Sequence, residues 1–472
     1  MLTASSPAAY KLLHDGVQAL SRAEHNGIRI DVDYLERTQK QTSSRIRDIE
    51  ADMKRSPLGK KWRRRYGSET NFGSGTQLST ILRNEGHELP QTENSKKYAE
   101  GDKRIRYKTD VEAIEKVDDP FIVLYLENEK LKKVSGTFLK GIQRELIDDR
   151  VHVSFNLHTT KTYRSSSSNF NFQNLPIRDP EQGKLIRQCF IPSPGNRLIE
   201  VDFGGIEVCI AACYHKDPRM ISYITDPSKD MHRDMAAQCF KMPTKEVTKM
   251  ARYGGKNMFV FPQFYGDYFV SCAGQLWDYM QRAKLHYKSS EDRLIIDELA
   301  RQGITERGLC TPGKPTMPGS FEDHIRGVEK HFWDKRFRTY RDWKKTWFAE
   351  YQKTGSFETK TGFRLEANIS RNDVINWPVQ GSAFHCLLQC FIWIMRAIAK
   401  RRMRTLLVGQ IHDSIVADVP DDETEDFLQL CNYVMTVLLL KRWEWINVPL
   451  EIEAEVTPVD GSWHTKKVMA IC

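Results

Sequence analysis

Along the first 150 residues, apolar and charged positions recur at the spacing of amphipathic helices. Residues 10–53 show this pattern on both sides of NGIRIDVDYL, which predicts a turn and a short strand before the next helix. Residues 71–90 begin with turn formers and end in a short helix, and residues 119–142 predict a long amphipathic helix. This part of the chain is therefore expected to form a helical lobe.

Beyond residue 150 the pattern changes to short β-branched stretches bounded by Gly, Pro, Asn or Asp. Four of these stretches predict strands of one sheet: RVHVSFNLH, RLIEVDF, LLVGQIHDSIVADVP and PLEIEAEV. Between the second and the third, residues 216–375 are mostly helical in pattern. The expected fold class is α/β in the broad sense (α+β), with a sheet assembled from distant segments around a helical insertion.

Charge adds a candidate binding surface for a polyanion. The formal net charge is +9, and residues 54–65, KRSPLGKKWRRR, hold seven basic side chains and no acidic one. Such a run suits nucleic acid, but it is equally typical of a solvated loop.

Cysteine spacing and hydropathy indicate a soluble protein of a reducing, intracellular compartment. The ten cysteines include no CxxC pair, which argues against a zinc site and a disulfide framework. The first residues lack an apolar signal core, and no stretch approaches the roughly 18 uninterrupted apolar residues of a membrane span. No membrane association is expected.

Two aspartates on predicted strands are candidates for metal-assisted chemistry. Asp202 closes LIEVDF, and Asp413 lies in VGQIHDSIV, where a hairpin is predicted. Phosphoryl transfer to a nucleotide uses two divalent ions about 4 Å apart, held by carboxylates on a rigid base. An Asp at a strand end is more often a turn former, so neither residue decides the chemistry alone.

Six segments follow one another along the chain: TYRSSSSNFNFQNLPIR, VDFGGIEV, DMHRDMAAQCF, RYGGKNMFVFPQFYG, INWPVQGSAF and QIHDSIV. They resemble the ordered motifs of DNA polymerase family A, the DNA polymerase I family; VDFGGIEV resembles motif A, RYGGKNMFVFPQFYG motif B and QIHDSIV motif C. The C-terminal VDGSWHTKK resembles the family's ending, so the resemblance runs from about residue 10 to the C-terminus.

The resemblance implies a right-hand polymerase with a palm sheet, helical fingers and a helical thumb. Residues 1–150 are expected to form the thumb, including a basic loop at 54–65. Residues 151–215 and 376–472 are expected to form the two parts of the palm, with motifs A and C, and residues 216–375 the fingers with motif B.

The implied activity is template-directed extension of a primer 3′ end with dNTPs, releasing pyrophosphate. Asp202, Asp413 and the backbone carbonyl of Phe203 are the implied ligands of two Mg²⁺ ions, with Mn²⁺ able to substitute. Glu207 takes the steric-gate position, where a bulky side chain excludes a 2′-hydroxyl. Ser414 departs from the family, which usually carries a second carboxylate after motif C.

Motif B supplies the implied nucleotide contacts. Arg252 and Lys256 are four residues apart, so on a helix both face one side and could bind the triphosphate. Lys256 is also the candidate to protonate or neutralise the leaving pyrophosphate, and His232 would add a phosphate contact. Phe261 and Tyr265 resemble the aromatic residues that stack near the nascent base pair.

The spacing within motif B departs from the family. Lys256 and Tyr265 are nine residues apart instead of eight, and Pro262 interrupts what should be one helix. We expect Arg252 and Lys256 on a regular helix, a kink or wide turn at residues 260–263, and Phe261 facing the nucleotide pocket.

Further polar residues match positions that in this family touch primer or template through the minor groove, where the acceptors are common to all correct pairs. They are Arg164, Gln173, Asn174, Asn376, Gln380 and His412. Contacts to DNA phosphates are also expected from Lys60, Lys61, Arg63, Arg64 and Arg65.

The chain is expected to have no 3′–5′ exonuclease, because it starts at about the point where the family's exonuclease domain would end. Proofreading would then belong to a longer parent protein or to a separate polypeptide, and a processivity factor is a further candidate partner. GKKWRRRYG and KNMFVFPQFYGDYF resemble bacteriophage members. A cytoplasmic monomer is expected, located in the bacterial host cell if the protein is phage-encoded. Two alternatives remain: a single-subunit RNA polymerase and a catalytically inactive nucleic-acid-binding scaffold.

Overall fold

The computed structural model describes residues 2–95, 97–98, 102, 104–176, 179–308 and 316–471. Its centre is a five-stranded antiparallel sheet in the order β12-β13-β7-β14-β15. These strands are β7 (Asn196–Phe203), β12 (Leu406–Ile411), β13 (Ser414–Pro420), β14 (Ile452–Val456) and β15 (Lys467–Met469). The sheet thus joins segments on both sides of a long helical insertion, as the sequence predicted.

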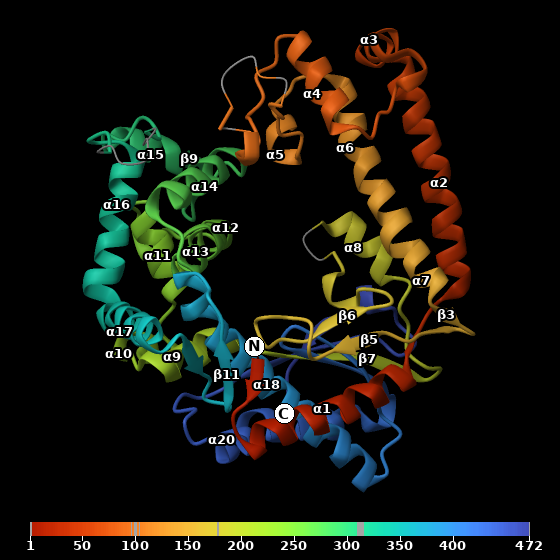
Figure 1. Cartoon of the computed structure of the whole chain (residues 1–472), viewed down its shortest axis with the longest axis vertical. Helices are drawn as coiled ribbons and strands as arrows, with labels where there is room; N and C mark the ends of the chain where they lie inside the picture. Colours follow the sequence, from red (N-terminus) through yellow and green to blue (C-terminus); the bar gives the residue numbers. More distant parts are fainter. Residues whose placement is uncertain are drawn as a thin grey trace.

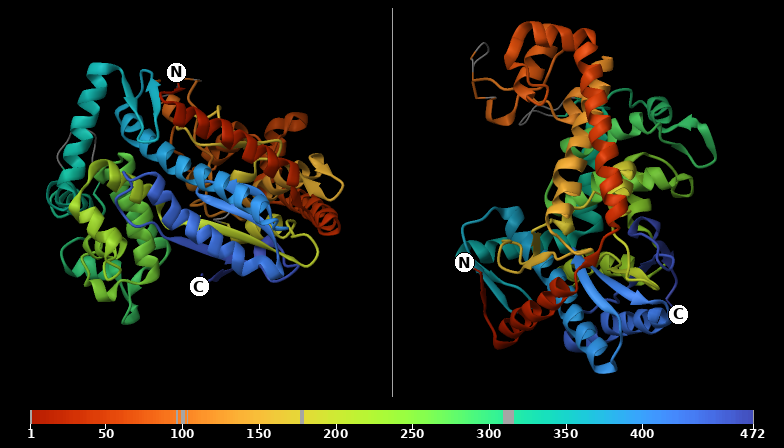
Figure 2. Two further views of the ribbon diagram at one scale, coloured as in Figure 1. Left: turned by 90° about the horizontal axis from the view of Figure 1, so that it is seen from below. Right: turned by 90° about the vertical axis from the view of Figure 1, so that its right-hand side faces the viewer.

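Long helices support this palm sheet. The core helix α18 (Arg371–Arg401) and the helix α19 (Thr424–Asn432) pack against β13, and α1 (Pro7–Asn26) runs along α18 and β12 (Figure 2). Among the described helices, α18 alone is long and apolar enough to cross a membrane. Its apolar window is 72% buried inside the protein, which is the environment of a core helix.

The expected boundaries of the thumb and the palm need two corrections. Residues 1–150 were assigned to the thumb, but α1 packs under the palm, and β1 (Leu2–Ala4) pairs with β11 (Phe363–Glu366). RVHVSFNLH was assigned to the palm sheet, but it forms β4 (Arg150–Val151) and β5 (Ser154–Asn156), which pair in two smaller sheets. A pattern shows which face of an element is apolar, but it does not show which neighbour covers that face.

The thumb rises from the palm as two long helical arms (Figure 1). One arm is α2 (Val32–Arg55), and the other runs from α6 (Pro120–Lys133) through a wide turn at Val134–Leu139 into α7 (Lys140–Arg144). The tip carries α3 (Pro57–Tyr66), α4 (Gly75–Asn84) and α5 (Val111–Ile114). A separate small core around Trp62, Phe72 and Phe121 holds the tip together.

The basic run is helical, which corrects the expectation of a loop at residues 54–65. It spans the end of α2 and most of α3, with Ser56 between them. The Ser56 hydroxyl accepts the N–H of Gly59, and Pro57 takes the first helical position. Both features favour a new helix start.

The fingers form the opposite wall in Figure 1 and consist mainly of helices. They contain α10 (Pro218–Thr225), α11 (Met231–Cys239), α12 (Lys249–Gly255), α13 (Phe261–Tyr265), α14 (Phe269–Arg282), α15 (Ile295–Arg301) and α16 (Phe321–His331). The next helix, α17 (Arg338–Thr354), returns to pack against α18 and against α9 (Ile206–His215), the helix that follows β7. These contacts fix the fingers to the palm.

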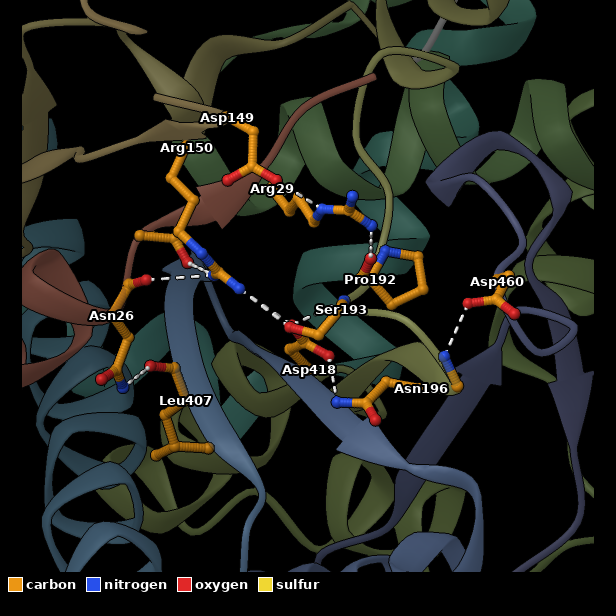
Figure 3. A network of polar contacts seen from close by, with 12 residues as sticks. Asn26, Arg29, Asp149, Arg150, Pro192, Ser193, Asn196, Leu407, Asp418 and Asp460 are labelled. Atoms are coloured by element: carbon orange, nitrogen blue, oxygen red, sulfur yellow. Dashed lines mark hydrogen bonds and ion pairs between the residues drawn. The ribbon is translucent and has the colours of Figure 1, made fainter. Parts of the chain in front are cut away.

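A partly buried polar network joins the base of the thumb to the sheet (Figure 3). Asp418 of β13 accepts hydrogen bonds from the Ser193 N–H (2.9 Å), the Ser193 hydroxyl (2.6 Å) and the Asn196 amide (2.8 Å). Arg150 donates to the Ser193 hydroxyl at 2.8 Å and to the carbonyl of Asn26 at 3.1 Å. Because Asp418 is only 2% exposed, these donors are needed to stabilise its carboxylate in the interior.

Candidate active site

The two aspartates from motifs A and C meet at one end of the palm sheet. Asp202 is the next-to-last residue of β7, and Asp413 lies in the two-residue turn between β12 and β13. Antiparallel pairing places Ser414 directly opposite Asp202, and the Phe203 N–H donates to the Asp413 carbonyl at 3.4 Å. The predicted hairpin is present, and it brings the two carboxylates together.

These carboxylates repel each other in a buried setting. Burial, with the nearby charges of Asp413 and Glu200, raises the pKa of Asp202 to about 8. Burial also raises the pKa of Asp413. The Asp202 Oδ1 atom is buried without a hydrogen-bond partner in the described part of the chain. A divalent cation fits such a pair, because it would supply the missing partner and offset the repulsion.

Asp413 borders a cavity of about 500 Å³ between palm and fingers. Its wall includes Asp413 and His412 from the hairpin, Glu207 from α9, Gln380 and Asn376 from α18, and Arg164, Phe261 and Tyr265. Palm and fingers therefore contribute facing walls to one pocket of nucleotide size.

Glu207 is held at the junction of these walls. Its carboxylate forms an ion pair with Arg164 and accepts the hydroxyl of Tyr265 at 2.8 Å. Asn376 donates to the backbone carbonyl of Tyr265 at 3.3 Å. Both interactions position the predicted gate residue and the predicted stacking tyrosine next to each other.

Motif B contains the expected distortion. A wide π-helical turn at Lys256–Val260 separates α12 from α13, and the Phe261 N–H reaches back five residues to the Lys256 carbonyl. This wide turn absorbs one extra residue. Pro262 follows directly after it and, lacking a backbone N–H, cannot donate a helical hydrogen bond at that position. The distortion starts at Lys256, four residues earlier than expected, so Lys256 lies in the wide turn and not on the regular helix.

Phe261 lines the cavity, as predicted, and it gathers two other candidate residues. The Lys256 Nζ atom lies 5.2 Å from the centre of the Phe261 ring. The His232 ring packs edge-on against the same Phe261 ring, with 5.6 Å between the two ring centres. Burial, with the charges of Lys256 and Arg252, lowers the pKa of His232 to about 4, so its imidazole is neutral at neutral pH. Arg252 donates to Asp230 at 2.7 Å, which fixes its guanidinium beside this group.

Other candidates lie outside the cavity wall. Gln173 is only 8% exposed, and its side-chain amide donates to the Ser165 hydroxyl at 2.9 Å. This hydrogen bond holds the Gln173 side chain in a buried position outside the cavity. Asn174 ends a short 3-10 turn, Phe172–Asn174. The basic residues of α3 lie on the exposed side of the thumb tip, and Lys61 is ion-paired with Glu85.

Several residues beside Asp202 were not singled out from the sequence. Glu200, Trp463 and Lys466 form a polar cluster with Ser414. The two-residue period of a strand could have placed Glu200 on the face of Asp202. The contacts from Trp463 and Lys466 come from a distant segment, and only the fold reveals them.

The model of DNA polymerase family A matches residues 32–288 and 329–464. The chain belongs to DNA polymerase family A. This membership agrees with the right-hand arrangement of palm, fingers and thumb.

Family A relatives match almost the whole chain. DNA polymerase I of Chloroflexus aurantiacus is 26% identical over 460 residues, which are 96% of this chain and 43% of that protein. DNA polymerase I of Bacillus subtilis is 27% identical, covering 95% of this chain and 44% of that protein. The chain thus spans less than half the length of these curated relatives.

A solved family A structure shares the fold. It is the POL domain of Pol1 from M. smegmatis in complex with DNA primer-template and dNTP. The TM-score is 0.71 at 25% sequence identity, and the match covers 95% of this chain and 70% of that one.

Proposed function

We propose that this chain is a template-directed DNA polymerase that extends a primer 3′ end with dNTPs and releases pyrophosphate. The observation that carries the proposal is the pair of buried, mutually repelling carboxylates, Asp202 and Asp413, beside a cavity whose far wall is motif B. Its substrates would be primer-template DNA and dNTPs, the molecules bound to the related M. smegmatis domain. It would act as a monomer in the cytoplasm of a bacterial cell, including a phage-infected one.

Asp202, Asp413 and the backbone carbonyl of Phe203 would hold two Mg²⁺ ions, or Mn²⁺ in their place. Bound ions of this kind activate a primer hydroxyl and neutralise charge on the transferred phosphate. The protein's own contribution is a rigid base: the β12–β13 turn and the end of β7 are fixed by sheet pairing. This geometry would keep both carboxylates aimed at one point.

The fingers would bind the incoming triphosphate. Lys256 and Arg252 supply fixed positive charge, and neutral His232 can donate a hydrogen bond without adding to it. Lys256 lies beside the Phe261 ring. In this arrangement the Phe261 ring would face the base of the nucleotide, and Lys256 would protonate or neutralise the leaving pyrophosphate. Tyr265 would stack near the same nascent base pair.

Glu207 would select the sugar. Its carboxylate is held by Arg164 and Tyr265, and these contacts would keep it beside the sugar, where it would exclude a 2′-hydroxyl. Arg164, Asn376, Gln380 and His412 border the same cavity and would read the geometry of the terminal base pair. Gln173, held by Ser165, and the exposed Asn174 would contact primer or template, and the basic residues of α3 would contact phosphates.

Single-nucleotide primer extension tests the proposal. The protein, a primer-template and Mg²⁺ should yield a primer one nucleotide longer with the complementary dNTP, and far less product with the matching ribonucleotide. Asp202→Ala protein is the control for a contaminating polymerase. Preferential use of ribonucleotides would favour an RNA polymerase, and absence of extension with either substrate would favour an inactive nucleic-acid-binding scaffold.

A further inference from the structure

The strand that carries Asp202 carries a second carboxylate on the same face. Side chains alternate along β7, so Glu200 and Asp202 point the same way, and Val201 between them is buried on the other side. On the neighbouring strand β13, Ser414 lies directly opposite Asp202. Ser414 stands where family A members usually carry a carboxylate.

Glu200 is tied down by three donors from two segments. The Ser414 hydroxyl donates to its Oε1 at 3.0 Å, the Trp463 indole N–H donates to its Oε2 at 3.1 Å, and Lys466 pairs with the same Oε2. The Glu200 side chain is only 14% exposed. The Lys466 side chain is only 11% exposed, so this ion pair lies inside the cluster and holds the carboxylate in place.

We propose that Glu200 is a positioning residue of the metal site, supplying from β7 the carboxylate that its relatives carry after motif C. This inference rests on the proposed function. Glu200 lies on the same strand as Asp202, and its hydrogen bond with Ser414 ties it to the residue directly after Asp413. The Glu200 side chain therefore restrains the backbone next to both proposed metal ligands. Trp463 and Lys466 from the C-terminal segment hold that side chain in turn.

Glu200 would act through charge and restraint and not by binding metal. Both of its oxygens already accept hydrogen bonds from the protein. Its carboxylate lies on the same face of β7 as Asp202, whose Oδ1 atom is buried without a hydrogen-bond partner among the described residues. Groups that orient metal ligands in this way typically change metal affinity by about 10–100-fold when they are removed.

The test exchanges the two residues. Mn²⁺ binding to the enzyme–primer-template complex is measured by electron paramagnetic resonance, together with primer extension and the Tm. Glu200→Ser should raise the half-saturating Mn²⁺ concentration by about tenfold or more. The double variant Glu200→Ser/Ser414→Glu, which returns one carboxylate to this face from β13, should recover to within about threefold of the parent.

Glu455→Ser is the matched control. Glu455 lies opposite Glu200 on β14 and also pairs with Lys466, but it makes no hydrogen bond with Ser414. Its replacement should leave Mn²⁺ binding unchanged. If Glu200→Ser fails to fold, Glu200→Gln keeps the size of the side chain while removing its charge and should show the same loss.

Two results would overturn the inference: Mn²⁺ binding that is unchanged in the Glu200 variants, or a double variant as weak as Glu200→Ser. The same assay on Asp202→Ala separates this failure from that of the proposed function. If Asp202→Ala abolishes Mn²⁺ binding and extension while Glu200→Ser changes neither, only the positioning role is wrong. If Asp202→Ala keeps both, the proposed active site itself is wrong.

Discussion

The Tyr265 hydroxyl donates to the Glu207 carboxylate at 2.8 Å, so the end of α13 in motif B is joined to the first turn of α9, where motif A ends. The pair lies where fingers and palm meet, and Arg164 forms an ion pair with the same carboxylate. The proposed sugar gate and the position of the fingers are therefore coupled through one side chain.

Replacing Glu207 should relax sugar selection. We expect Glu207→Ala to raise ribonucleotide incorporation relative to deoxynucleotide incorporation, because the space beside the sugar opens. Tyr265→Phe removes one hydroxyl and leaves Glu207 paired with Arg164, so its effect on the ratio should be smaller. Single-turnover incorporation of both nucleotide types measures the ratio of ribonucleotide to deoxynucleotide use. An unaltered ratio in Glu207→Ala would show that another residue is the gate.

Removing a proposed metal ligand should abolish chemistry while stabilising the metal-free fold. Asp202→Ala and Asp413→Ala should each lose primer extension but bind primer-template within a few-fold of the parent, because the basic surface is unchanged. In metal-free buffer at neutral pH, each variant should have a higher Tm than the parent, because burial disfavours the ionised carboxylate in the folded state, as the raised pKa of each Asp indicates, and Ala has no such group. Extension at about a tenth of the parental rate would contradict the assignment.

The helical basic surface should govern the salt dependence of DNA binding. Changing Lys60, Arg63, Arg64 and Arg65 to Ser should flatten the plot of log affinity against log salt by about 0.9 for each DNA phosphate that the protein no longer neutralises. Lys61→Ser should change the slope less, because Lys61 is already paired with Glu85. Titrations at several salt concentrations measure the slope, and single-turnover extension at saturating DNA should stay near the parental rate. A slope identical to that of the parent would mean that α3 does not touch DNA.

Buried neutral histidines should make the fold sensitive to acid. Burial lowers the pKa of His215 and of His385 to about 3, from about 6.5 in an unfolded chain. Between these values the unfolded state binds more protons, so the free energy of unfolding rises with pH and falls as the pH drops below about 6.5. Each histidine should contribute a slope of about 1.4 kcal/mol per pH unit in the acid part of this window.

His385→Gln tests this dependence. The His385 ring lies within 2.8 Å of the Thr361 hydroxyl and is fully buried, so the variant should be less stable at pH 7 but less sensitive to acid. Urea unfolding between pH 5 and pH 8 measures both effects. Above pH 7 the free energies of unfolding of the two proteins should depend on pH in the same way. If the two dependences were also the same down to pH 5, the role of this histidine would be refuted.

The sequence predicted the elements whose local signals are strong. The hairpin at Asp413, the strand that carries Asp202 and the distortion near Pro262 were all expected, because strand and turn chemistry and the missing proline N–H act locally. The helix at 57–66 was missed, although Ser56 and Pro57 form a start signal, because the dense positive charge favoured a loop interpretation.

Tertiary contacts were less accessible from the sequence. The apolar stripe of α1 does not show that it faces α18, and nothing near Gln173 in its own motif indicates that Gln410 of β12 would share its partner Ser165. The cluster around Glu200 likewise depends on Trp463 and Lys466, which reach it only after the sheet has closed.

The strand order of the palm also bears on how the protein is made. β7 is the central strand, and both of its neighbours, β13 and β14, come from the last part of the chain. Glu200 and its partner Ser414 are 214 positions apart, so a ribosome completes the whole fingers region before β7 can pair. Until then the nascent chain carries a β-branched strand with two unpaired edges, a state prone to aggregation. Assembly of the active site should therefore be a late event in synthesis, and slow translation of the C-terminal strands would prolong the interval in which the protein depends on chaperones.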